Sequence, residues 1–189
     1  LSLRRQRQMC IRDRLISMQS QEFEKWLGDF QQLRLPLWSE FPDLDLYMDQ
    51  VISEVNKRLS PLLDVKITKT MINSYVKMAI IERPEKKRYN RDHLAELIVV
   101  SIMKLVFPLD VIKQGISQSL ANDTAGKAYD QFVRLFNAEI ANINAQSTVN
   151  EFNLNEEPLN IVQKVAVKSV IYKLIGTKLV TLEEPISIL

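Results

Sequence analysis

The chain has 189 residues, of which 46% are hydrophobic and 25% are charged, a balance typical of a globular protein and not of a disordered or collagenous one. Its apolar runs are broken before they reach the roughly 20 residues that a membrane span needs, so the sequence predicts a soluble, cytoplasmic protein. One cysteine and one histidine exclude an internal disulfide and a structural zinc site, and four glycines leave no phosphate-binding loop. We therefore expect no metal and no cofactor.

The first 17 residues differ in composition from the rest, because they carry five arginines and one aspartate. Such an arginine-rich, acid-poor start is typical of a targeting peptide or of a basic arm for nucleic acid. The string RQRQMCIRD also resembles the translated remnant of a sequencing adapter, and Met18 lies just downstream as a natural start. We expect residues 1–17, with Cys10, to be a non-native leader that takes no part in the fold.

Amphipathic helices are predicted first over residues 22–33 and then over about 46–59, where apolar residues recur every three or four positions. Between them, prolines at 36 and 42 disfavour helix and predict an extended strap. Its large apolar side chains would pack on the core of the protein. We assign residues 18–43 to an N-terminal helix and strap.

Residues 67–91 are the most informative stretch and read ITKTMINSYVKMAIIERPEKKRYNR. Thr68 can cap a helix that runs to about Ala79 and buries Ile72 and Tyr75. Its opposite face carries hydrogen-bond donors without a carboxylate, as a helix that contacts bases and phosphates would; these residues are Lys69, Thr70, Asn73 and Lys77. The segment ERPEKKRYN that follows combines a proline with a run of bases, and predicts a short hairpin or tight loop that would form a wing.

Positive charge is concentrated in the same stretch. Residues 66–91 hold eight basic and two acidic residues, whereas the rest of the chain after residue 17 is net acidic. Basic side chains bind nucleic acid by neutralising phosphates and releasing counterions, although a basic stretch can also be only a solvated face. The order of helix, wing and helix favours the nucleic-acid interpretation.

Further helices are predicted over 92–106, from Leu109 onwards, over 125–145 and over 157–175, with Gly176 ending the last of them. We expect residues 44–120 to form one compact unit and residues 121–189 to form a C-terminal helical region for dimerisation or effector sensing. The last helix is apolar over more than one stripe, which suits the core or a subunit contact, and core burial is our preferred interpretation. The tail KLVTLEEPISIL would form a short strand or lie extended.

Catalytic arrangements are not found in the sequence, so we expect the protein not to be an enzyme. The acidic pairs Asp43/Asp45, Glu156/Glu157 and Glu183/Glu184 lie in or beside predicted connectors instead of a cleft. His93 falls in the first turn of a predicted helix, where a protonated imidazole is disfavoured, and we expect it to be neutral and either structural or on the surface.

The stretch from residue 67 to 116 resembles the DNA-binding domain of the MerR family of bacterial transcription regulators. In that family a Ser or Thr starts the recognition helix, a Gly-Leu-Leu or Gly-Leu-Ile ends it, and the wing ends in Arg-x-Tyr. The corresponding segments here are Thr68, Ala79-Ile80-Ile81 and Lys87-Arg88-Tyr89, followed by Asp92-His93-Leu94 and by the turn from Phe107 to Ile112. Ala79 and Lys87 depart from the family's glycine and arginine.

Four separated blocks, LPLW, LYMDQV, ITKTMINSYVK and KKRYNRDHLAELI, resemble a bacterial family catalogued as domain of unknown function 1836, whose members are regarded as MerR-like DNA binders. The two resemblances imply a mostly α-helical protein: a MerR-like winged helix-turn-helix followed by a C-terminal pair of helices. They imply that the exposed face of the recognition helix contacts the major groove and that the wing residues Lys86, Lys87, Arg88 and Tyr89 hold the flanking backbone, with Tyr89 packing to fix the wing.

We therefore expect a transcription regulator that binds double-stranded DNA in a sequence-specific manner, as a homodimer, and that associates with the nucleoid when bound. MerR regulators dimerise through a long helix after the winged domain, in whose place the sequence predicts two shorter ones. The alternative is a non-enzymatic protein-interaction module whose basic face binds an acidic partner.

Overall fold

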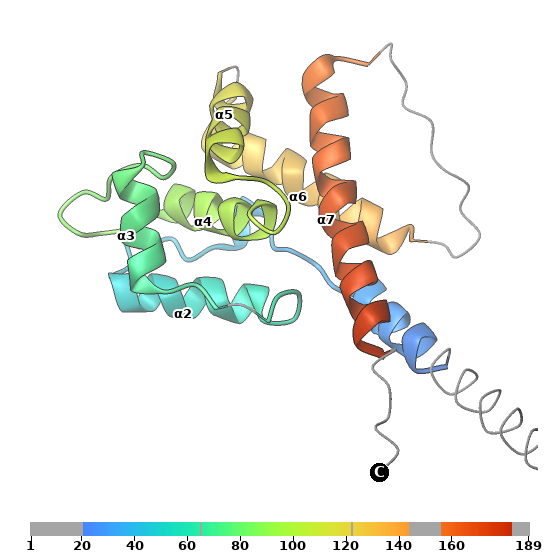
Figure 1. Ribbon diagram of the computed structural model, residues 1–189. Helices are drawn as coiled ribbons and strands as arrows, with labels where there is room; N and C mark the ends of the chain where they lie inside the picture. The colour runs from blue at the N-terminus through green and yellow to red at the C-terminus, as the bar shows by residue number, and fades with distance from the viewer. Residues whose placement is uncertain (1–20, 65, 122, 144–155, 183–189) are drawn as a thin grey trace, which may run out of the picture.

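A computed structural model describes residues 21–64, 66–121, 123–143 and 156–182. The expectations for residues 1–17 and for the tail after residue 182 lie outside these ranges. The described chain is mostly helical, as predicted, and begins with a helix that covers residues 21–31. The elements that follow are the 3-10 turn η1 (Trp38–Glu40) and the helices α2 (Met48–Leu59), α3 (Lys69–Lys77), α4 (Arg91–Met103), α5 (Leu109–Leu120), α6 (Ala125–Ala141) and α7 (Pro158–Leu182) (Figure 1).

Helix α4 lies at the centre of the molecule, in contact with α2, α5, α6, α7 and η1 (Figure 1). Nine of its thirteen residues are buried, which explains why its sequence is apolar on all sides. The buried side chains form one continuous cluster from Phe30 near the N-terminus to Ile171 in α7. Among the described residues, the strap, the helices α2 to α5 and the C-terminal helices α6 and α7 therefore share one hydrophobic core.

The predicted strap packs on the core through Trp38. Its backbone N–H donates to Asp130 Oδ1 (2.7 Å), and its indole Nε1 donates to Asp92 Oδ1 (2.8 Å). Gly126 at the start of α6 makes room for the ring, because a Cβ built there would lie 3.1 Å from an indole carbon. The strap is thus hydrogen-bonded to both α4 and α6 through Trp38.

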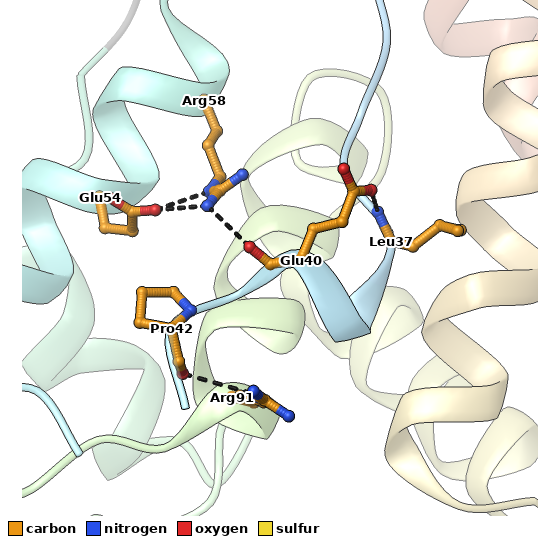
Figure 2. Close-up of polar contacts among 6 residues, drawn as sticks. All are labelled: Leu37, Glu40, Pro42, Glu54, Arg58 and Arg91. Atoms are coloured by element: carbon orange, nitrogen blue, oxygen red, sulfur yellow. Dashed lines mark hydrogen bonds and ion pairs between the residues drawn. The ribbon is translucent and has the colours of Figure 1, made fainter. Parts of the chain in front are cut away.

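Two arginines hold the rest of the strap (Figure 2). Arg58 of α2 forms an ion pair with Glu54 (2.5 Å) and also points towards the carbonyl oxygen of Glu40, at 3.4 Å. Arg91 at the start of α4 donates from Nε to the carbonyl oxygen of Pro42 (3.3 Å). These bonds give the irregular backbone of the strap fixed partners on two helices.

Two predicted helix boundaries differ in the structure near α2 and α4. Leu46 is not helical, because it pairs with Tyr89 in an isolated antiparallel bridge before α2 begins. Helix α4 ends at Met103, and a turn leads to Pro108. The described residues contain isolated bridges and no extended strand.

The prediction that Gly176 ends the last helix is wrong, because α7 continues through it to Leu182. Gly176 keeps a negative φ and therefore does not form the left-handed C-terminal cap that glycine often supplies. With 25 residues α7 is about 38 Å long and extends beyond the predicted range of 157–175; with α6 it forms the predicted C-terminal pair of helices. Only Val167, Val170 and Ile171 of α7 are buried. None of the helices in the described ranges is long and apolar enough to cross a membrane.

Candidate nucleic-acid interface

The connector between α2 and α3 is fixed by one side chain, Asn56 of α2. Its Nδ2 donates to the carbonyl oxygen of Ile67 (3.0 Å), and its Oδ1 accepts from the backbone N–H of the same residue (2.7 Å). The side chain of Ile67 is itself buried. Asn56 therefore sets where the chain leaves the connector and where α3 begins.

Helix α3 starts as predicted, because the Thr68 hydroxyl oxygen accepts from the backbone N–H of Met71 (3.4 Å). Ile72 and Tyr75 are its buried residues. The opposite face is exposed and contains the four predicted contact residues, Lys69, Thr70, Asn73 and Lys77. No carboxylate occurs in α3, so this face presents cationic and neutral polar groups to solvent.

Helix α3 ends in a Schellman cap built on alanine. The N–H of Ile80 donates to the carbonyl oxygen of Tyr75 (2.9 Å), and the N–H of Ala79 donates to that of Val76 (3.0 Å). Ala79 has a φ of 52°, the left-handed conformation that glycine adopts at lower steric cost. The left-handed turn at the end of α3 is therefore formed by alanine.

Two lysines from neighbouring helices support the same end of α3. Lys104 donates to the Tyr75 hydroxyl (3.1 Å), and Lys113 of α5 donates to the carbonyl oxygen of Met78 (3.1 Å). A positive charge at a helix C-terminus is favourable because the unpaired carbonyls there carry partial negative charge. The position of α3 is thus coupled to both α4 and α5.

The basic segment after α3 forms a hairpin with a two-residue turn. Glu85 and Arg88 pair in an antiparallel bridge, and the N–H of Arg88 donates to the carbonyl oxygen of Glu85 (2.7 Å). Lys86 and Lys87 at the tip have φ angles of 47° and 62°, as in a type I′ turn, where Asn-Gly is preferred. The hairpin projects from the same end of the molecule as α3 (Figure 1).

The last two predicted wing residues have different environments. Arg88 is exposed, and its guanidinium stacks 4.1 Å from the centroid of the Tyr47 ring. Tyr89 is buried, bridges to Leu46 and meets the His93 ring edge-on at 5.4 Å. The structure therefore gives Tyr89 the packing position that anchors the base of the hairpin.

His93 is buried and belongs to the cap of α4. The backbone N–H of His93 donates to Asn90 Oδ1 (3.2 Å), and the backbone N–H of Asn90 lies 3.1 Å from His93 Nδ1. Its Nε2 is buried without a hydrogen-bond partner among the described residues, and burial lowers the pKa of the imidazole. His93 is therefore a structural residue that orients α4 and contacts the hairpin.

Glu96 is a polar residue that we did not single out from the sequence, and it links α4 to the hairpin. Its Oε2 accepts from the backbone N–H of Glu82 (3.1 Å), just before the hairpin turn. Burial raises the pKa of Glu96 to about 7, because desolvation disfavours the charged carboxylate. A lone carboxylate within the apolar run from Leu94 to Val100 is the signal that could have identified it.

The site so built is a donor-rich helix face beside a lysine-tipped hairpin. Within the described ranges, no group of three or more histidine, cysteine or acidic residues is placed to hold a metal ion.

The family model described as Domain of unknown function (DUF1836) matches residues 36–138, more than half of the chain. The chain belongs to this family, as the four sequence blocks predicted. No curated protein and no solved structure matches the chain.

Proposed function

We propose that the protein is a non-enzymatic transcription regulator that binds double-stranded DNA in a sequence-specific manner through a MerR-like winged helix-turn-helix. Helix α3 would enter the major groove, where Asn73 is placed to pair with a base and Lys69, Thr70 and Lys77 to contact bases or phosphates. The hairpin would act as the wing, with Lys86, Lys87 and Arg88 on the flanking backbone.

The observation that carries the proposal is the backbone conformation at the tip of the hairpin. Two consecutive lysines have positive φ, although each non-glycine residue in that region costs about 1–2 kcal/mol. Both side chains are exposed. Strained residues of this kind favour a functional role over a structural one, and paired cations on a protruding turn suit contact with phosphates.

We further propose that the regulator acts as a homodimer through α7. This helix leaves Tyr172 and Val180 about two thirds exposed, more than a helix packed only inside a monomer would need. A symmetric dimer would place two recognition helices on two half-sites of an operator. We propose a cytoplasmic location, with association to the nucleoid when DNA is bound.

The function is tested by fluorescence anisotropy of the full chain on the DNA upstream of its own gene and on a scrambled duplex, across a series of salt concentrations. A specific regulator should bind the natural duplex more tightly, survive competitor DNA and lose affinity steeply as salt rises. Equal, weak binding to both duplexes would contradict the proposal. It would favour the alternative, a module whose basic face binds an acidic protein.

Variants separate the two parts of the interface. Asn73→Ala should reduce the preference for the natural duplex, because the base contact is lost. Lys86→Asn with Lys87→Gly supplies the residues that the turn prefers, so it should preserve the hairpin while weakening binding to all duplexes and lowering the salt slope by about 2.

Lys127→Ala on α6 is the matched control, because Lys127 is exposed and lies outside α3 and the hairpin. It should leave both affinities unchanged. Equal effects of the helix variant and the hairpin variant on sequence preference would contradict the division between base contacts and phosphate contacts.

A further inference from the structure

A cavity of about 310 Å³ lies between α4, α5, α6 and α7. In Figure 1, α5 and α7 stand apart on either side, with α6 behind them. The walls are mostly apolar and include Val99, Met103, Phe107, Ile112, Ile116 and Phe132. Both the volume and the lining are in the range of small-molecule sites in proteins, which are largely apolar with a few placed polar groups.

The cavity has one charged wall residue among those described, Glu96 of α4. Two other polar residues in the wall are paired with each other, because Gln163 Nε2 donates to the Ser119 hydroxyl (3.2 Å). Glu96 accepts one hydrogen bond from the Glu82 backbone through Oε2, and its Oε1 accepts none from the residues that the structure describes. Its carboxylate is therefore the wall group available for an oppositely charged ligand.

Exposed apolar side chains continue the cavity to the surface. Val111 of α5 and Val162 of α7 both line it and are 46% and 53% exposed. Hydrophobic side chains left in water around a pocket mark the entrance of a site for an apolar molecule.

We propose that this cavity binds a small apolar molecule that carries a single positive charge, with the charge paired to Glu96. The apolar walls would supply most of the binding free energy by removing hydrocarbon surface from water. Glu96 would supply selectivity, because a half-buried carboxylate in an apolar wall favours a cation and rejects an anion.

The same residue connects the cavity to the proposed DNA interface, and this second step rests on the proposed function. Glu96 touches the backbone of the segment that leads into the hairpin. Lys113 ties α5, another wall of the cavity, to the end of α3. A cation bound at Oε1 of Glu96 would shift the carboxylate whose Oε2 holds the Glu82 N–H, and so change the hairpin's position and the DNA affinity.

Three matched probes test the site: 1-naphthylmethylamine, 1-naphthylmethanol and 1-naphthoate, which share a ring system and differ in charge. Binding to the full chain is measured by calorimetry at pH 8, where Glu96 is ionised and the amine is positive. We expect the amine to bind at least ten times more tightly than the alcohol, and the naphthoate more weakly than both. Equal affinities for the three probes would overturn the proposal.

Two variants locate the binding. Glu96→Gln should reduce the ratio of amine to alcohol affinity to about one, while the alcohol still binds. Gly115→Leu should abolish binding of all three probes, because Gly115 lines the cavity and a Cβ there meets no atom within 4 Å. Gly176→Leu, also at an open helical position but outside the cavity, should leave binding unchanged.

Probe binding that persists in Gly115→Leu would contradict the assignment of the binding site to this cavity. So would a result in which no probe binds and Gly115→Leu instead breaks a dimer, since a second copy would then occupy the cavity. The DNA step has its own readout: the amine should change DNA affinity in the wild type and not in Glu96→Gln. If the protein bound no DNA at all, the proposed function would fail while the three-probe comparison still decided the site.

Discussion

Ala79 holds a backbone conformation that its side chain disfavours, because the Schellman cap of α3 requires a left-handed residue at that position. We predict that Ala79→Gly raises the free energy of unfolding by about 1 kcal/mol, by relieving the steric strain of the Cβ. Chemical denaturation of the two proteins measures the difference. Ala138→Gly in the exposed part of α6 is the matched control and should destabilise by about 1 kcal/mol, because no strain is relieved there.

Glu96 predicts a pH dependence of stability. Burial raises its pKa to about 7, and the neighbouring acidic residues Glu82 and Asp92 act in the same direction. A carboxyl with a raised folded-state pKa contributes stability that is complete below its unfolded pKa and is lost as the pH rises through the folded value. Glu96→Gln should therefore be more stable than the wild type at pH 8, by up to about 3 kcal/mol, with the advantage shrinking towards pH 5.

The quantity to measure is the difference in free energy of unfolding between Glu96→Gln and the wild type. His93 is present in both proteins and changes stability with pH in the direction opposite to Glu96, so its contribution cancels in the difference. Its pKa is lowered by burial, so its contribution to stability is present above the unfolded pKa and is lost as the pH falls. Denaturant titrations at several pH values give the difference directly. Glu24→Gln, at an exposed carboxyl, serves as the control. A constant gap between Glu96→Gln and the wild type from pH 5 to 8 would contradict the assignment.

At the residue scale, the sequence correctly predicted the features that depend only on residues close together in the chain. The Thr68 cap, the exposed donors of α3 and the hairpin turn depend on residues a few positions apart, and the structure contains all of them. The role of Glu96 could not be predicted in this way. It depends on α5, α6 and α7 closing a cavity around α4, and no short-range pattern records that arrangement.

At the scale of the element, α3 depends on the Asn56 bonds to Ile67 in the connector before it. Asn56→Ala would leave the backbone N–H and carbonyl of Ile67 without these partners. We predict a loss of about 1–3 kcal/mol in the free energy of unfolding and faster hydrogen exchange at the Ile67 amide. The exposed Asn160 provides the comparison, since Asn160→Ala should change neither quantity. Unchanged exchange at Ile67 in Asn56→Ala would show that other contacts place the connector.

The helices themselves could be predicted better than their ends. Apolar periodicity located every α-helix of the described chain, because a face that is buried along its length repeats every three to four residues, but it did not locate the 3-10 turn η1 in the predicted extended strap. The predicted end of α7 was wrong because glycine can adopt the left-handed conformation of a helix cap but does not have to. With the rest of the turn helical, Gly176 stays in the helix.

At the scale of the whole molecule, one core joins the strap, the central segment and α7. We predict a single cooperative thermal transition, with coincident curves from the fluorescence of Trp26 and Trp38 and from the far-ultraviolet circular dichroism of all helices. A chain cut after residue 143 should fail to fold, because α4 and α6 would lose α7, whose Val167, Val170 and Ile171 are buried in the shared core. Two separated transitions would show that residues 44–120 and the C-terminal region are independent domains.

The enclosure of α4 also bears on how proteins of this family can diverge. The stretch described by the family model ends at residue 138, within α6, and so includes α4 and α5 but leaves out α7. Substitutions in α4 disturb packing on every side, whereas α7 has buried residues on only one face. Substitutions in α7 can thus change one wall of the cavity while the walls formed by α4 and α5, and the helix and hairpin beside them, keep their packing. A copy of the gene with an altered α7 would in this way gain a cavity for a different molecule and keep the proposed DNA interface.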